Sequence, residues 1–258
     1  MNDFETRFGG IARLYGAPGL ARLRAAHICV VGVGGVGAWT AEALARSGIG
    51  AITLVDLDEV CVTNINRQLH ALTDTVGRAK VDVMAERIRA INPDCRVLVE
   101  QKFFNEHTAD ELLAPKFDFV VDAIDSVSNK LLLLAKCRRI SRPVVACGGA
   151  GGRRDGTAVR MADLAKVTHD RLLSEVRKKF RQEFHLTANG SALGVMCVFS
   201  AETPVYPQPD GTVCENRPPM DDETRLNCNG GLGSATFVTG AFGFAAAGWV
   251  VKETAGSR

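Results

Sequence analysis

Residues 27–58, HICVVGVGGVGAWTAEALARSGIGAITLVDLD, decide the fold of this chain. An apolar run leads into a glycine-rich turn, a stretch with helical spacing follows, and a second apolar run ends on Asp56. The turn contains Gly32, Gly34, Gly35 and Gly37. This order of strand, glycine turn, helix, strand and acid is typical of a nucleotide-binding βαβ unit, in which backbone N–H groups at the helix N-terminus approach a phosphate. Asp56 is expected to hold ribose hydroxyls.

Polar residues further along favour ATP, although the glycine turn by itself is compatible with NAD as well. Arg67 and Gln68 follow Asp56 closely. Lys80 comes soon after them, and Asp125 ends a later apolar strand. In a doubly wound sheet these side chains meet at the carboxyl edge of the strands. Attack on the α-phosphorus of a triphosphate needs cations around the transferring group and a carboxylate for Mg²⁺. We therefore predict an ATP site with Arg67, Lys80 and Asp125 as catalytic residues and Asp125 as the magnesium ligand. A nicotinamide dehydrogenase is an alternative.

The order of apolar and helical stretches predicts the architecture. Buried strands alternate with helices up to the glycines at 148–152, which predicts an α/β protein with a Rossmann-like, doubly wound, mainly parallel sheet. After these glycines we expect an antiparallel extension and a C-terminal helix. The expected elements are strands at 157–161 and 194–199, a basic helix at 170–184 and an apolar helix at 235–251.

We expect the chain to divide into an ATP-binding domain at 1–152 and an extension at 153–258 that continues the same core. A stretch rich in Pro, Gly, Asp and Asn predicts a mobile loop at about 203–229. The apolar stretch 235–251 has 17 residues, which is marginal for crossing a bilayer. We expect it to pack against the core or at a dimer interface, with membrane association as the alternative.

The composition describes an ordinary globular protein of 258 residues, 46% hydrophobic and 23% charged, with a net charge of +2. The net charge therefore gives no indication of a nucleic acid or an acidic surface as a partner. The eight cysteines form no Cys-x-x-Cys pair, so no zinc site is expected. The polar start of the chain has no secretory signal, which favours the cytoplasm and free thiols.

Three runs of the sequence resemble a known superfamily. They are VGVGGVGAWTAEALARSGIGAITLVDLDEVCVTNINRQ at 31–68, GRAKV at 77–81 and DAID at 122–125. They resemble the adenylating domain of ubiquitin-activating-like enzymes of the ThiF/MoeB/HesA type, which activate a carboxylate as an acyl-adenylate and release pyrophosphate. The resemblance implies a glycine loop for the phosphates, a ribose contact from Asp56 and a magnesium contact from Asp125. The other nucleotide-binding residues that it implies are Asp58, Asn64, Arg67, Gln68 and Lys80.

The second half resembles a narrower group, the tRNA threonylcarbamoyladenosine dehydratases. The matching runs are ACGGAGGRRDGT, LAKVTHDRLL, CVFSAETPVYPQPDGTVC and RLNCNGGLGSATFVTGAFGF. These enzymes use ATP to cyclise a modified adenosine next to the anticodon. The resemblance implies a tRNA substrate, a homodimer, a monovalent cation (Na⁺ or K⁺) and a sulfur-relay partner. Two alternatives remain: an adenylyltransferase for a ubiquitin-like sulfur-carrier protein, and a binding module without catalysis.

Positive charge gathers in one region of the chain. Between residues 130 and 181 there are fourteen basic and four acidic residues, a local balance of +10. Such a segment predicts contact with RNA phosphates, and no DNA partner is expected. The candidate RNA-binding residues are Arg153, Arg154, Arg177, Lys178, Lys179 and Arg181. Cys228, at the end of the expected mobile loop, is a candidate reactive thiol for an acyl or sulfur-relay step, with an incidental thiol as the alternative. The sequence identifies no general base for ring closure.

Overall fold

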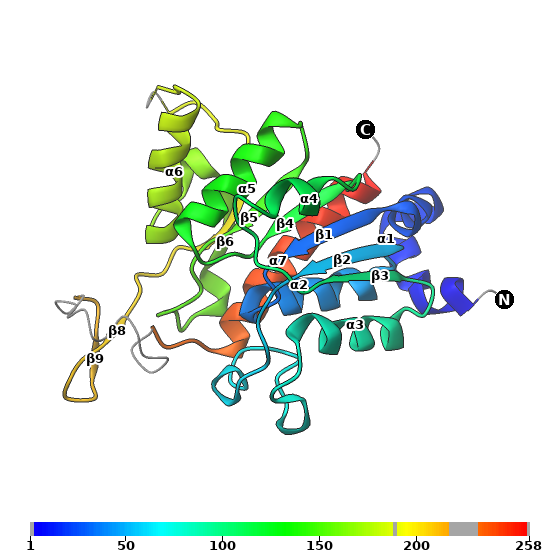
Figure 1. Cartoon of the computed structure of the whole chain (residues 1–258), viewed down its shortest axis with the longest axis horizontal. Coiled ribbons are helices and arrows are strands. Elements are labelled where there is room, and N and C mark those ends of the chain that lie inside the picture. The colour runs from blue at the N-terminus through cyan, green and yellow to red at the C-terminus, as the bar shows by residue number, and fades with distance from the viewer. Residues whose placement is uncertain (1–2, 188–189, 217–231, 257–258) are drawn as a thin grey trace.

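The computed structural model describes residues 3–187, 190–216 and 232–256. Its main feature is a seven-stranded sheet with the order β3-β2-β1-β4-β5-β7-β6 (Figure 1). Neighbouring strands are parallel, except that β6 runs antiparallel to β7 with Val159 opposite Ser200. The predicted α/β fold with an antiparallel extension is therefore confirmed. The strands are β1 His27–Val31, β2 Ala51–Val55, β3 Arg96–Glu100, β4 Phe119–Asp122, β5 Val144–Cys147, β6 Val159–Asp163 and β7 Met196–Ser200.

Helices cover both faces of this sheet, as the alternation of strands and helices requires. They are α1 Asp3–Ala25, α2 Gly35–Arg46, α3 Lys80–Ile91, α4 Ala109–Leu113, α5 Val127–Arg139, α6 Arg171–Glu183 and α7 Thr236–Ala255. Successive side chains of a strand point to opposite faces. Ile28 and Val30 of β1 join the core with α2, α3 and α7, whereas Cys29 and Val31 join a second cluster with α4 and α5. Burial on both faces explains why these strands read as continuous apolar runs.

The C-terminal helix α7 packs against α2, as expected for a core helix. Gly243 permits the close approach, because a Cβ atom there would lie 2.6 Å from the Cβ of Trp39 and 2.8 Å from the carbonyl oxygen of Val36. Among the described residues, no helix is long and apolar enough to cross a membrane.

The second half of the chain continues the sheet of the first half. The strands expected at 157–161 and 194–199 begin two residues further along the chain, as β6 and β7. Part of the segment expected to be a loop at 203–229 forms a hairpin of β8 Tyr206–Pro207 and β9 Val213–Cys214. The Asp210-Gly211 pair is the sequence signal for this turn, and Asp210 accepts a hydrogen bond from the Thr212 N–H. Residues 217–231, and with them Cys228, lie outside the described part of the chain.

Candidate nucleotide site

The glycine turn joins β1 to α2 with almost no free space. The Gly32 N–H donates to the carbonyl oxygen of Val55 at 2.8 Å, and its φ of +90° is a conformation that favours glycine. A Cβ atom on Gly37 would lie 1.8 Å from the carbonyl oxygen of Gly32. The start of α2 therefore sits directly behind the turn, where its unpaired N–H groups and its dipole favour an anion.

A cavity of about 850 Å³ opens at the carboxyl edge of the sheet beside this turn. It collects nearly all the residues that the sequence assigned to the nucleotide. They are Gly32, Gly34, Gly35, Asp56, Asp58, Asn64, Arg67, Gln68, Lys80 and Asp125. Gly37 does not line the cavity and instead packs α2 against the turn that follows β1. The structure thus brings the predicted set together, while the contact of each residue with a nucleotide stays a prediction.

Asp56 shapes the glycine turn from the end of β2. One carboxylate oxygen accepts the Val33 N–H at 2.6 Å and the other accepts the Asp58 N–H at 2.9 Å. Burial raises the pKa of this carboxyl, and these two hydrogen bonds oppose the rise. Asp56 therefore has a structural role beside the expected ribose contact, and each of its oxygens keeps a further lone pair for a ligand.

The predicted cations are held at the cavity by different means. Lys80 is 6% exposed, and its Nζ lies 2.7 Å from a carboxylate oxygen of Asp58, so two predicted site residues form an ion pair. Arg67 donates from Nη1 to the carbonyl oxygen of Thr63 at 2.6 Å. The carbonyl oxygen of Arg67 accepts from Trp39 and Thr239, which attaches this segment to α2 and α7.

Two polar groups of the cavity have no partner among the described residues. The Gln68 side chain is 7% exposed and its Oε1 is buried without a hydrogen bond, so it fits a ligand that donates one. Asp125, three residues after the end of β4, presents an exposed carboxylate to the cavity. The described residues contain no group of three or more metal-binding side chains. Mg²⁺ commonly takes only one or two carboxylates together with substrate phosphates, so Asp125 fits that ion when a triphosphate is bound.

Part of the cavity comes from residues that the sequence did not reveal. On one side it is lined by Lys102, Phe103 and Phe104, which follow β3. The aromatic pair Phe103-Phe104, shortly after the carboxyl end of β3, was the sequence signal that could have been used, and the Phe103 ring is 51% exposed in the structure. The opposite side is formed by residues 148–151, Leu172 and residues 232–234. We call residues 148–151 and 232–234 the acceptor wall.

The structure separates the basic residues into buried and exposed ones. Lys130 is fully buried and pairs with Asp122 at 2.8 Å, so it adds nothing to the surface charge. Arg153 is 4% exposed, and its terminal nitrogens donate to the carbonyl oxygens of Glu202 and His169. A guanidinium held inside the protein in this way is not available to a phosphate. Arg153 is therefore not placed to contact RNA in this structure.

The other candidate RNA residues lie nearer the surface. Arg177 and Arg181 are half-buried in α6, and Arg177 donates to the carbonyl oxygens of Leu164 and Val167. Lys178, Lys179 and Arg154 are exposed.

The burial of His70, two residues after Gln68, predicts that the stability of the protein depends on pH. The ring is 1% exposed, and neither nitrogen has a partner among the described residues. Burial and, to a smaller extent, the charge of Lys80 lower its pKa from 6.5 to about 4. Between these two values the unfolded chain binds a proton that the folded chain does not. The contribution of His70 to the free energy of unfolding is therefore fully present above pH 6.5. It falls by about 1.4 kcal/mol per pH unit as the pH drops towards 4.

We expect urea denaturation of the wild type to show this loss, about 3 kcal/mol in all, between pH 6.5 and 4. A His70→Leu variant, which has no proton to gain, should lack this component. An identical pH dependence in both proteins would contradict the assignment to His70.

Comparisons with known proteins agree with this geometry. The ThiF family matches residues 10–253. The tRNA threonylcarbamoyladenosine dehydratase of Escherichia coli (strain K12) is 52% identical over 97% of this chain and 94% of that protein. The crystal structure of the E. coli enzyme TcdA in complex with ATP has 47% sequence identity and a TM-score of 0.86, over 98% of this chain and 96% of that one. The adenylyltransferase and sulfurtransferase MOCS3 of Drosophila willistoni is 31% identical, over 55% of this chain and 30% of that protein.

Proposed function

The chain belongs to the ThiF family, and within it to the tRNA threonylcarbamoyladenosine dehydratases, and we propose that it uses ATP to cyclise threonylcarbamoyladenosine in tRNA. The observation that carries this proposal is the meeting of the glycine turn, Lys80, Arg67 and Asp125 in one cavity. The similarity to the dehydratases over nearly the whole chain supports tRNA as the substrate in preference to a ubiquitin-like sulfur-carrier protein.

The proposed chemistry removes one water from the nucleoside in two steps. The threonine carboxylate attacks the α-phosphorus of ATP, pyrophosphate leaves, and a mixed anhydride with AMP forms. The carbamoyl group of the same side chain then attacks the activated carbonyl and loses a proton. AMP leaves with one of the carboxylate oxygens. Because the second step is intramolecular, correct positioning supplies much of its rate.

Each part of the cavity has a role in this scheme. The N-terminus of α2 and the glycine turn bind the phosphates, while Gln68 is placed to accept a hydrogen bond from the nucleotide. Lys80 and Arg67 stabilise the negative charge that develops at the α-phosphorus. Asp125 would hold Mg²⁺, which neutralises charge on the phosphates and on the departing pyrophosphate. Lys80 already has Asp58 as a partner, so the arriving phosphates compete with that carboxylate.

Mass spectrometry of the nucleosides in tRNA after incubation with the protein, ATP and Mg²⁺ tests this function. We expect the threonylcarbamoyladenosine mass to fall by one water, with AMP and pyrophosphate as co-products. ATP–pyrophosphate exchange that responds to a small carrier protein, and not to modified tRNA, would support the alternative adenylyltransferase. Failure to bind ATP with Mg²⁺ in a thermal-shift assay would support a non-catalytic binding module.

We further propose that tRNA lies along α6 to reach the cavity. This helix supplies Leu172 to the cavity lining from its first turn and carries exposed Lys178 and Lys179 further along. The exposed Arg154 lies in the loop that continues the acceptor wall. A path from the cavity to the basic part of α6 would let the backbone phosphates position the nucleoside without contact to its bases.

Removing both lysines as Lys178→Ala/Lys179→Ala should weaken tRNA binding and make it less sensitive to salt. The slope of log affinity against log salt concentration is expected to fall by about 0.7 to 0.9 for each phosphate that the variant no longer neutralises. Fluorescence titrations at several salt concentrations measure this slope. Lys116→Ala, an exposed lysine before β4 at a distance from α6 along the chain, is the matched control. An unchanged slope in the double variant would exclude this part of α6 as a phosphate contact.

We also propose a homodimer formed through α7. The exposed rings of Phe237 and Phe244 lie on this helix, 60% and 52% exposed, and Trp39 of α2 packs edge-on against Phe244. Exposed aromatic patches of this kind often mark interfaces. Equilibrium sedimentation would test it, and a monomer at micromolar concentration would exclude it.

The cytoplasm, where ATP and tRNA occur, is the proposed location. Use of Na⁺ or K⁺, docking of a sulfur-relay partner and a reactive role for the Cys228 thiol also remain predictions.

A further inference from the structure

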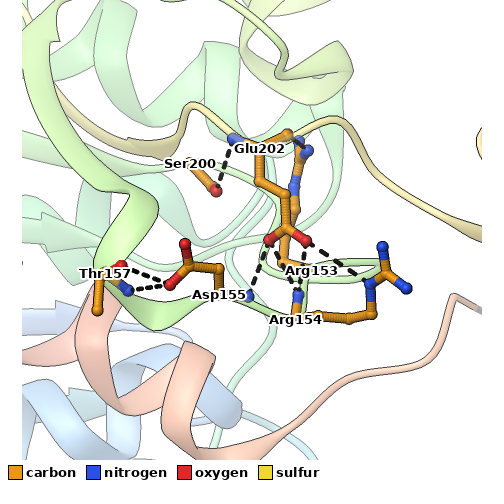
Figure 2. A network of polar contacts seen from close by, with 6 residues as sticks. All are labelled: Arg153, Arg154, Asp155, Thr157, Ser200 and Glu202. Carbon is orange, nitrogen blue, oxygen red and sulfur yellow. Dashed lines mark hydrogen bonds and ion pairs between the residues drawn. The ribbon is translucent and has the colours of Figure 1, made fainter.

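The carboxylate of Glu202 accepts several backbone hydrogen bonds and lies outside the nucleotide end of the cavity. Figure 2 shows its side chain pointing at the backbone of Arg154 and Asp155. One carboxylate oxygen accepts the N–H groups of Arg154 at 2.9 Å and Asp155 at 3.0 Å, and the other accepts the Arg154 N–H at 3.1 Å. The Glu202 N–H donates to Ser200 Oγ at 3.1 Å, which fixes the start of the side chain at the end of β7. The carboxylate therefore attaches the residue 153–155 backbone to the end of β7.

A second set of contacts ties this backbone to α6. Arg153 lies between the carbonyl oxygens of Glu202 and His169 and donates to both. Asp170, which follows His169, caps α6 by accepting the Leu173 N–H at 2.9 Å. It also accepts the Gly149 N–H at 2.8 Å. Gly149 belongs to the acceptor wall. The start of α6, the end of β7 and the acceptor wall are thus held in one hydrogen-bonded unit.

Both ends of the segment that follows β7 meet the same unit at Gly152. The Val205 N–H donates to the Gly152 carbonyl oxygen at 2.9 Å, and the Gly152 N–H donates to the Gly233 carbonyl oxygen at 2.7 Å. The φ of +72° at Gly152 favours glycine, and a Cβ atom there would lie 2.8 Å from the Val205 carbonyl oxygen. The position of residues 232–234, which line the cavity, therefore depends on the backbone that Glu202 holds.

The nucleotide end of the cavity touches the acceptor wall through Asn66, whose Nδ2 donates to the Ser234 carbonyl oxygen at 2.7 Å, but it does not touch the residues that hold this wall. Asp56 contacts Val33 and Asp58, Lys80 contacts Asp58, and Arg67 contacts Thr63 and Asn66. None of these residues contacts Glu202, Arg153 or Asp170 among the described residues. Resting on the function proposed above, we propose that Glu202 is a positioning residue that sets the acceptor wall for the tRNA-dependent step and leaves ATP binding unaffected.

The proposal is tested by comparing Glu202→Ala with Glu202→Gln. The alanine variant removes the acceptor for both N–H groups, whereas glutamine keeps one carbonyl oxygen that can accept them. We expect Glu202→Ala to lower kcat/KM for the modified tRNA by about 10- to 100-fold, as small misplacements of a reacting group do, with the Kd for ATP unchanged. Glu202→Gln should recover most of the loss. Glu106→Ala, which removes an exposed carboxylate elsewhere, is the control and should behave as the wild type.

Amide hydrogen exchange supplies a readout that does not need activity. In Glu202→Ala we expect faster exchange at the amides of Arg154 and Asp155, which Glu202 accepts, and at those of Gly152 and Val205, with the amides of α2 and the glycine turn unchanged. Equal losses in ATP affinity and in tRNA turnover, or no change in exchange at Arg154 and Asp155, would overturn the proposal. If Glu202→Ala is insoluble, Glu202→Asp keeps the charge but draws the carboxylate back, and a smaller loss of the same kind is expected. A wild type that leaves the nucleoside unchanged would refute the proposed function alone, since the exchange data still decide the role of Glu202.

Discussion

Asp125→Ala is expected to slow acyl-adenylate formation strongly while the protein remains folded. The carboxylate is exposed at the edge of the cavity and has no ion-pair or hydrogen-bond partner among the described residues, so its loss should cost little stability. Without it, Mg²⁺ would lose the protein ligand proposed above, and the charge on the transferring phosphate would be less well neutralised. A loss of about 10³-fold in the rate of AMP production is expected, in line with the removal of one well-placed electrostatic contact.

The measurement is AMP release with modified tRNA, together with a thermal melt to show that the fold is retained. Asp74→Ala, an exposed aspartate that does not line the cavity, is the matched control and should keep full activity. Raising the Mg²⁺ concentration should recover part of the Asp125→Ala activity if the carboxylate acts through the metal. AMP production at the wild-type rate would show that Asp125 takes no part in adenylation.

The nucleotide half of the site could be predicted because its residues follow strands. Asp56 follows β2, Asp125 follows β4, and the glycine turn follows β1, so the topology of a parallel sheet is sufficient to bring them to one edge. Lys80 could be predicted for a similar reason, since it begins the helix that leads back from that edge to β3. Spacing along the chain thus contains most of the information about this half.

The half of the site that the acceptor wall forms could not be predicted in the same way. Residues 148–151 and 232–234 form one wall only because Gly152, Val205 and Gly233 pair across long sequence separations. The basic residues show the same limit. Lys130 and Arg153 belong to the run that predicted a positive surface, but one lies in a buried ion pair and the other is bonded to the carbonyl oxygens of two loops. Whether a charged side chain faces solvent is decided by tertiary packing, which the local pattern does not record.

The role of Asp56 also became clear only in three dimensions. The fingerprint predicts a ribose contact from its position after the second strand. In the structure its carboxylate also supports the glycine turn through the Val33 N–H. Substitution at Asp56 would therefore change the shape of the phosphate site as well as any ribose contact, whereas Asp125 tests one function alone.

Gly37→Ala is expected to have the largest effect on folding, although it adds only one methyl group. The new Cβ would lie 1.8 Å from the carbonyl oxygen of Gly32 and 2.9 Å from its carbonyl carbon. Both atoms belong to the backbone of the tight turn and cannot rotate away, so α2 must move off β1. Overpacking of this kind costs about 3 kcal/mol, which corresponds to a fall in Tm of about 6 to 12 °C for a chain of this size. ATP binding should fall as well, because the helix N-terminus moves away from the phosphate site.

The control for this change is Gly10→Ala in α1, where the new Cβ would meet only the guanidinium of Arg13 at 3.9 Å. Alanine favours a helix interior over glycine by about 1 kcal/mol, so this variant should be as stable as the wild type or slightly more stable. Calorimetry and ATP titration of the two variants separate the steric clash from the general effect of replacing glycine. A Gly37→Ala protein with the Tm and ATP affinity of the wild type would show that α2 can move away from β1 at little cost, and that the close packing of the turn is not what forms the phosphate site.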